Sequence, residues 1–225
     1  MKTAILVCAY NEDEVIISVI NSILNTSPLS IIIVNDGSTD DTESILVELH
    51  SNNKVYFLHH LVNCGKGAAI KTGFAFAKKM KIDNLITFDA DGQHDPQDIT
   101  HILDKLEENY TFVNGSRFFA SGNQVPTLKY FANFFANILA KFLYGVRLTD
   151  TQSGLRGYNV ASFPTLDLCG DDYQLETQVL TSINYQKFCE VPIKVKYTSY
   201  SLSKNRRMNL DMMIKNAWHI IWGAI

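Results

Sequence analysis

A short acidic stretch is the part of the chain whose residue types and spacing best suit chemistry. The run Asp89-Ala90-Asp91-Gly92-Gln93-His94-Asp95-Pro96 follows directly after the mostly apolar residues 85–88. Carboxylates two positions apart on a strand point to opposite sides, but a turn at the strand end lets both approach one ion. Such hard oxygen ligands suit Mg²⁺ or Mn²⁺. An Asx-rich turn without a metal would use the same residues, so this stretch alone leaves both interpretations open.

Two other turns carry groups that could bind an anion. In 34–42, Asp36 ends an apolar run, Gly37 permits a close backbone approach, and Ser38 or Thr39 would cap the helix that follows. In 63–69, Lys66 lies between two glycines at a second helix start, without the GxxxxGK[ST] pattern of a P-loop. Helix N-termini favour anions, although both stretches are also ordinary strand-to-helix turns.

The elements that position these turns alternate along the first half of the chain. Short β-branched runs predict strands, and helical periodicity predicts helices. The strands are expected at 4–8, 31–34, 55–59, 85–88 and 110–113, and the helices at 12–25, 40–50, 67–79 and from Pro96 onward. This alternation is typical of a parallel sheet covered by helices, where ligands bind at the carboxyl ends of the strands. Residues 1–116 are therefore predicted to form a nucleotide-binding α/β unit.

The second half is less regular. Residues 126–144 predict a phenylalanine-rich helix, 173–183 another helix, 189–197 a strand interrupted by Pro192, and 208–225 an amphipathic helix. We expect the aromatic face of 126–144 to be buried, with a membrane-facing helix as the alternative. The run between Glu14 and Asp36 has no charged residue, but its polar residues and Pro28 predict a helix and a strand rather than a membrane span.

The composition excludes several protein classes. The 225 residues include 20 basic and 23 acidic side chains, and a net charge of -3 argues against a protein that coats nucleic acid. The four cysteines form no CxxC pair, which argues against a zinc ribbon or a disulfide scaffold and favours reduced thiols. No signal peptide is recognised at the start, so we expect a cytoplasmic protein.

Taken in order, a set of motifs resembles the family 2 glycosyltransferases. The motifs are Cys8-Ala9-Tyr10-Asn11-Glu12, Asn35-Asp36-Gly37-Ser38, Gly65-Lys66-Gly67, Asp89-Ala90-Asp91-Gly92-Gln93, Gly115-Ser116-Arg117-Phe118, Asp150-Thr151-Gln152-Ser153-Gly154-Leu155-Arg156-Gly157-Tyr158 and Glu190-Val191-Pro192-Ile193. Within that family the chain looks most like the dolichyl- and polyprenyl-phosphate mannosyl- or glucosyltransferases, over about residues 4–207.

The resemblance implies a GT-A fold, an α/β architecture with a mostly parallel central sheet flanked by helices. Residues 1–207 would form the glycosyltransferase domain, with a nucleotide-sugar half at 1–116 and an acceptor half at 117–207, and 208–225 would be a helical tail. The implied activity is a metal-dependent, inverting transfer of a hexose from a nucleotide-sugar of the GDP-mannose or UDP-glucose type to a polyprenyl or dolichyl phosphate. The implied cofactor is Mg²⁺ or Mn²⁺.

The resemblance also assigns roles by position. The nucleotide-sugar would be bound by Ala9, Tyr10, Glu12, Asp36, Lys66, Asp89, Ala90 and Asp91. The metal would be held by Asp91, Gln93 and Asp89. The catalytic residues would be Asp89, Asp91, Arg117 and Glu176. The acceptor or its phosphate would be bound by Gln152, Ser153, Arg156, Lys204 and Arg206.

Two positions depart from the family pattern. Asn35 replaces the first aspartate of the usual Asp-Asp-Gly-Ser turn, and Gln174 replaces the first of two glutamates, which leaves Glu176. A lipid phosphate is already anionic and can attack without a base, whereas a hydroxyl acceptor would need one. Transfer to a saccharide hydroxyl and a non-catalytic nucleotide-sugar-binding homologue are the alternatives.

Two other enzyme classes share this layout. A sugar-1-phosphate nucleotidyltransferase should carry a glycine-rich loop with arginine after the first strand, and a dinucleotide-dependent oxidoreductase should carry GxGxxG there. Residues 8–12 contain neither pattern. We further expect the protein to lie at the cytosolic face of a membrane, in contact with it through 128–146 or 208–225.

Overall fold

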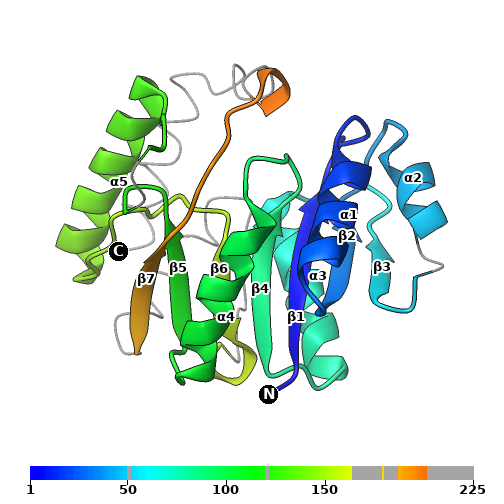
Figure 1. The fold of residues 1–225 in the computed structure, drawn as a ribbon, viewed down its shortest axis with the longest axis horizontal. Helices are drawn as coiled ribbons and strands as arrows, with labels where there is room; N and C mark the ends of the chain where they lie inside the picture. Colours follow the sequence, from blue (N-terminus) through cyan, green and yellow to red (C-terminus); the bar gives the residue numbers. More distant parts are fainter. Residues whose placement is uncertain (50–51, 120–121, 164–178, 180–186, 202–225) are drawn as a thin grey trace.

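The structure is a computed structural model of the chain, and it describes residues 1–49, 52–119, 122–163, 179 and 187–201 (Figure 1). Most of the predicted helix at 173–183 and all of the predicted tail at 208–225 lie outside these residues. The same holds for three of the predicted site residues, which are Glu176, Lys204 and Arg206.

A seven-stranded sheet in the order β3-β2-β1-β4-β6-β5-β7 forms the centre of the molecule. The strands are β1 (Thr3–Ala9), β2 (Ser30–Asn35), β3 (Val55–His59), β4 (Asn84–Asp89), β5 (Phe112–Ser116), β6 (Arg156–Asn159) and β7 (Phe188–Pro192). Strand β6 pairs antiparallel with β4 and β5, and the other described pairs are parallel. The mostly parallel sheet expected from the sequence is therefore confirmed, while β6 was not predicted.

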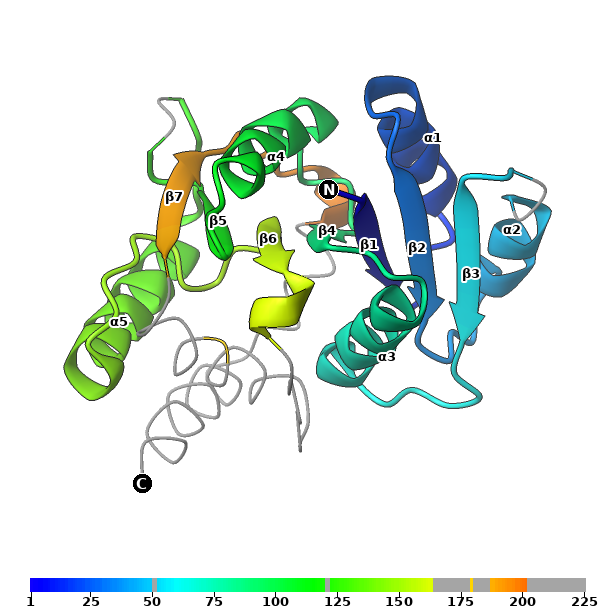
Figure 2. The ribbon, with the colours of Figure 1, turned by 90° about the horizontal axis from the view of Figure 1, so that it is seen from below.

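Helices cover both faces of this sheet (Figure 2). The helical elements are α1 (Ile16–Thr26), α2 (Thr42–Leu49), α3 (Lys66–Lys79), the 3-10 turn η1 (Pro96–Asp98), α4 (Ile99–Glu107), α5 (Thr127–Tyr144) and the 3-10 turn η2 (Val160–Ser162). On one face, Ile20 of α1 and Ile102 of α4 pack in one apolar cluster with Val7 of β1. On the other face, Phe74 of α3 packs with Leu6. Successive side chains of β1 therefore pack alternately into two apolar cores, one on each face of the sheet.

The first two helices begin later than their periodicity predicts. Helix α1 begins at Ile16, whose N–H donates to the carbonyl oxygen of Glu12 at 2.9 Å. The prediction that Ser38 or Thr39 caps α2 is wrong. The N–H of Thr42 donates to the Asp40 carboxylate at 3.0 Å, and not to either hydroxyl. The Ser38 hydroxyl instead accepts from the N–H of Asn11 at 3.0 Å. This bond joins the loop after β1 to the loop after β2.

The aromatic face of α5 is exposed, so the expectation that it would be buried is wrong. Phe135 is 62% exposed and Phe142 is 89% exposed. The helix turns small and polar residues inward instead, because the side-chain amides of Asn133 and Asn137 both donate to the carbonyl oxygen of Thr149, at 2.8 and 2.7 Å. Among the described residues, no helix combines the length and the apolar character needed to cross a membrane.

Candidate active site

A cavity of about 320 Å³ opens where β1, β2 and β4 end. Its lining consists of Cys8, Ala9, Tyr10, Glu12, Asp36, Asn63, Gly65, Lys66, Ala69, Asp89, Ala90 and Asp91. The structure therefore brings together all eight residues that the sequence predicted for nucleotide-sugar binding. Of the four others, Cys8 and Gly65 belong to the motifs from which that prediction came, and Asn63 and Ala69 lie within two residues of one. A cavity of this size at the carboxyl edge of a parallel sheet can enclose a small polar ligand.

Asp36 organises one wall of the cavity. It follows β2, and its carboxylate accepts hydrogen bonds from the N–H groups of Cys64 (3.0 Å) and Gly65 (2.8 Å). The same carboxylate lies 2.6 Å from Nδ1 of His60. Gly37 has a φ of +63°, and a Cβ there would lie 2.3 Å from the backbone of Val62. Only glycine allows this close approach, so the turn after β2 fixes the loop that leads into α3.

Asp89 ends β4 and lies between two basic groups. Its Oδ1 is 2.6 Å from Nζ of Lys66, and its Oδ2 is 3.7 Å from Nε2 of His94. Burial raises the pKa of Asp89, but the ammonium of Lys66 and the His94 ring outweigh burial and hold that pKa well below its usual range. Gly154 closes the other side, since a Cβ there would lie 1.8 Å from the carboxylate. The carboxylate is therefore ionised and tightly positioned.

Asp91 and Gln93 complete the acidic turn, which is formed by residues 89–95 at the end of β4. One carboxylate oxygen of Asp91 accepts from the N–H of Gln93 at 3.1 Å, and the other accepts from its side-chain amide. Carboxylate and amide oxygens from one short turn are the donor set that Mg²⁺ and Mn²⁺ prefer, so the residues fit such an ion. The side chain of the neighbouring His94 is 5% exposed, and its Nδ1 has no hydrogen-bond partner among the described residues.

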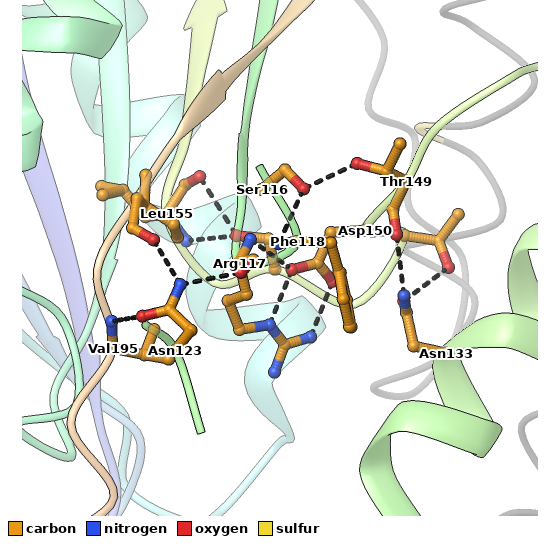
Figure 3. Close-up of polar contacts among 12 residues, drawn as sticks. Ser116, Arg117, Phe118, Asn123, Asn133, Thr149, Asp150, Leu155 and Val195 are labelled. Carbon is orange, nitrogen blue, oxygen red and sulfur yellow. Dashed lines mark hydrogen bonds and ion pairs between the residues drawn. The ribbon is translucent and has the colours of Figure 1, made fainter. Parts of the chain in front are cut away.

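Arg117 forms a doubly bonded ion pair with the buried Asp150 (Figure 3). Its Nε and Nη2 each lie 2.6 Å from a carboxylate oxygen, and its backbone N–H donates to the same group at 3.1 Å. Burial lowers the pKa of Arg117, but the Asp150 carboxylate outweighs burial and raises it. Nη1 of Arg117 lies 3.5 Å from the hydroxyl of Tyr197, and Nζ of Lys129 lies over that ring at 5.0 Å. Arg117 and Lys129 thus flank one tyrosine.

Lys129 is the second cation of this group and was not predicted as a site residue. Burial and the guanidinium of Arg117 hold the pKa of Lys129 below its usual value, and the carboxylates of Asp91 and Asp89 offset this only in part. The lysine therefore lies within electrostatic reach of the acidic turn. An anion placed beside Arg117 and Lys129 would stabilise the charged form of the lysine.

Three residues predicted for the acceptor side lie on or beside β6. Arg156 is 6% exposed, and its guanidinium donates to Asn114 Oδ1 (3.2 Å) and to the carbonyl oxygen of Thr151 (2.5 Å). Ser153 is also buried, and its hydroxyl bonds within its own turn, while Gln152 is half-buried. These contacts support a structural role for Arg156 in holding the loop before β6. Its predicted phosphate contact stays a prediction.

A second cavity, of about 390 Å³, lies along α5. Its lining combines apolar and aromatic side chains with polar and basic ones: Phe118, Tyr130, Phe134, Ile138 and Leu148, then Asn133, Asn137 and Thr149, and finally Lys141 and Arg147. The sequence prediction missed this cavity because it placed the aromatic face of the helix in the core. It also missed His60, although the position of His60 directly after β3, at the carboxyl edge of the sheet, was a usable signal.

Comparison with known proteins gives consistent results. The family model described as "Glycosyl transferase family 2" matches residues 4–166. The UDP-N-acetylglucosamine--dolichyl-phosphate N-acetylglucosaminyltransferase of Methanococcus voltae is 33% identical over 93% of this chain and 92% of its own length. The polyprenol monophosphomannose synthase of Mycolicibacterium smegmatis is 28% identical over 97% of this chain and 87% of its own length.

Solved structures show the same fold. The glucosyl-3-phosphoglycerate synthase of Mycobacterium tuberculosis in complex with UDP has a TM-score of 0.73 and 18% identity, over 99% of this chain and 80% of that one. The same enzyme solved with Mn²⁺, UDP and phosphoglyceric acid has a TM-score of 0.71 and 17% identity, over 99% of this chain and 78% of that one. At 17–18% identity, these structures are evidence for the fold alone.

Proposed function

The chain belongs to glycosyl transferase family 2 and is a GT-A glycosyltransferase, and from this premise we propose that it transfers a hexose from a nucleotide-sugar to a polyprenyl phosphate. The observation that carries the proposal is the cavity lined by Asp36, Lys66, Asp89 and Asp91. Arg117 and Lys129, which both contact Tyr197, supply two further cations. The names of the relatives from Methanococcus voltae and Mycolicibacterium smegmatis favour a lipid-phosphate acceptor over a saccharide hydroxyl.

The donor half of the proposed site binds a nucleoside diphosphate. Mg²⁺ or Mn²⁺ held by Asp89, Asp91 and Gln93 would stabilise the negative charge that develops on the leaving diphosphate. Lys66, now paired with Asp89 at 2.6 Å, is placed to turn to a donor phosphate, and it begins α3, whose positive end favours anions. Ala9, Tyr10, Glu12 and Asp36 would surround the nucleoside.

The acceptor half supplies positive charge and an apolar wall. Arg117 and Lys129 would hold the acceptor phosphate close to the sugar, and the phosphate oxygen, already ionised, would attack the anomeric carbon. A single displacement of this kind inverts the configuration and needs no general base. The cavity of about 390 Å³ along α5 would accommodate the first part of the polyprenyl chain.

The exposed face of α5 supports contact with the membrane that holds such an acceptor. Aromatic side chains on this face would enter the interface, and Lys141 on the same helix would meet anionic headgroups. We expect Phe135→Glu to weaken co-sedimentation with anionic liposomes several-fold. Val47→Glu is the matched control, because Val47 is 55% exposed but lies on α2. Equal binding by both variants and the native chain would show that α5 does not carry the contact.

A transfer assay tests the proposed activity. Radiolabelled UDP-glucose, UDP-N-acetylglucosamine and GDP-mannose are each incubated with the protein, Mn²⁺ and a detergent-dispersed polyprenyl phosphate, and label in the organic phase is measured. We expect one donor to label the lipid and the unphosphorylated polyprenol to stay unlabelled. Lys129→Gln should raise the acceptor KM about tenfold, as expected for the loss of one charge-assisted hydrogen bond of about 1.5 kcal/mol. The matched control is Lys79→Gln, because Lys79 is an exposed lysine of α3, and it should leave this KM unchanged. Equal labelling of the unphosphorylated polyprenol, or no labelled lipid with any of the donors, would overturn the proposed acceptor.

A further inference from the structure

Three side chains beside the donor cavity form a cluster that the proposed reaction does not use as a unit. Asp36 follows β2, His60 follows β3, and Cys64 precedes α3. A carboxylate oxygen, an imidazole nitrogen and the thiol sulfur of these residues all lie within 4.8 Å of one another. We propose that this cluster is a second metal site, specific for a thiophilic ion such as Zn²⁺ and separate from the acidic turn at Asp89 and Asp91.

The ligand types select this class of metal. Zn²⁺ binds thiolate, imidazole and carboxylate at about 2.0–2.3 Å, and three protein ligands with one open position are a common zinc arrangement. Mg²⁺ and Mn²⁺ prefer oxygen ligands and discriminate against sulfur. The Asp36–His60 hydrogen bond, at 2.6 Å, would open slightly to admit the ion, because tetrahedral ligands about 2.1 Å from a metal lie more than 3 Å apart.

Neighbouring groups already hold two of the three ligands by hydrogen bonds. Nε2 of His60 lies 2.8 Å from the hydroxyl of Thr72, so Nδ1 is directed toward Asp36. The second oxygen of Asp36 accepts from the N–H of Gly65 at 2.8 Å. A metal-bound histidine usually donates its other N–H to such a partner, and bound carboxylates are hydrogen-bonded in the same way. The third ligand, Cys64, is exposed and can therefore be reached from solvent.

The site borders the donor cavity, since Asp36 belongs to both and Gly65, which also lines the cavity, donates to the Asp36 carboxylate. A metal ion here would be held by the Asp36 carboxylate, one oxygen of which faces His60 while the other accepts from Gly65. Its open coordination position would be filled by water or by a ligand in the cavity. The metal binding itself does not depend on the proposed function, because it is measured without a nucleotide-sugar or an acceptor.

Cadmium titration tests the proposal, because a thiolate bound to Cd²⁺ gives a charge-transfer band in the ultraviolet. We expect the band to saturate with one equivalent of Cd²⁺, to be removed by Zn²⁺ and to persist in excess Mg²⁺. The band should be lost in Cys64→Ser and retained in Cys8→Ser. Cys8 is the matched control, since it lines the donor cavity together with Asp36 but burial raises the pKa of its thiol to about 12. A native protein without the band, or a band that survives in Cys64→Ser, overturns the proposal.

Two further variants distinguish a metal site formed by all three ligands from metal binding by the Cys64 thiol alone. Thr72→Val keeps the shape of the side chain but removes the partner of His60, and we expect about ten- to hundredfold weaker Cd²⁺ binding. His60→Gln should weaken binding at least as much. Thermal unfolding confirms that each variant is folded. If both bind Cd²⁺ as tightly as the native protein, Cys64 binds alone and the proposed site does not exist.

Discussion

Replacing Gly154 by alanine tests whether the position of the Asp89 carboxylate controls the chemistry. The new Cβ would lie 1.8 Å from Oδ2 of Asp89, whereas ordinary contact begins at 3.4 Å, so the carboxylate must move by about 1.6 Å. Asp89 is half-buried, and the atoms that the new Cβ would meet are the end of its side chain, so the clash can be relieved without moving the backbone. The chain can therefore fold, at a cost of about 1–3 kcal/mol for overpacking.

The displaced carboxylate would leave Lys66 and the acidic turn, which together are proposed to hold the donor. Misplacement of a reacting group by about 1 Å can lower a rate by about 100-fold, and we expect a loss of that size in kcat for Gly154→Ala. Metal-dependent binding of a nucleoside diphosphate should weaken in parallel. The assays are the lipid transfer reaction and calorimetric titration, with thermal unfolding recorded for the same sample.

Gly157→Ala on β6 is the matched control. A Cβ there would lie 2.5 Å from Ile102 and 2.9 Å from Leu106, so it crowds apolar core side chains instead of Asp89. We expect a similar loss of stability with near-native kcat for the folded fraction. A Gly154→Ala protein that is folded, moves the sugar at the native rate and binds metal and nucleotide normally would refute the role assigned to Asp89.

Three further substitutions test other contacts. Asp150→Asn removes the buried partner of Arg117, and the free energy of unfolding measured in urea should fall by about 3 kcal/mol. Asp40→Ala removes the acceptor for Thr42 N–H and should destabilise by about 1 kcal/mol at neutral pH. Burial raises the pKa of Asp40, but hydrogen bonds from Thr42 outweigh burial and lower that pKa. The carboxylate therefore stabilises the fold above its unfolded-state pKa. The stability difference between the native chain and Asp40→Ala should vanish as the pH falls through the folded-state pKa. Lys66→Gln should weaken nucleoside diphosphate binding about tenfold in calorimetry, as expected for one lost charge-assisted bond, and less at high salt.

The parallel half of the fold could be predicted from sequence because each strand there is a continuous apolar run followed by polar residues. The run 31–34 is fully buried in β2, and Asn35 and Asp36 follow it at the sheet edge. The same pattern located the cavity, since a residue just after a buried parallel strand must lie at that edge. The antiparallel strand β6 escaped prediction because its four residues, Arg-Gly-Tyr-Asn, include no β-branched side chain.

The remaining misses depend on contacts between residues far apart in the chain. The inward face of α5 is decided by the amides of Asn133 and Asn137, whose acceptor on Thr149 lies beyond the helix. Likewise, His60 acquires a role only because Asp36, 24 residues earlier, faces it. A periodic pattern reports which residues share a face, but it does not report which face meets the core.

Calorimetric titration of UDP, GDP, dTDP and CDP, with and without Mn²⁺, tests the central claim most directly, because the claim places a metal-dependent donor site in the cavity lined by Asp36, Lys66 and Asp91. The account predicts that one nucleotide binds tightly only when Mn²⁺ is present. It also predicts that Asp91→Asn, although folded, loses that binding. Tight binding without metal, or equal binding by Asp91→Asn, would contradict the account.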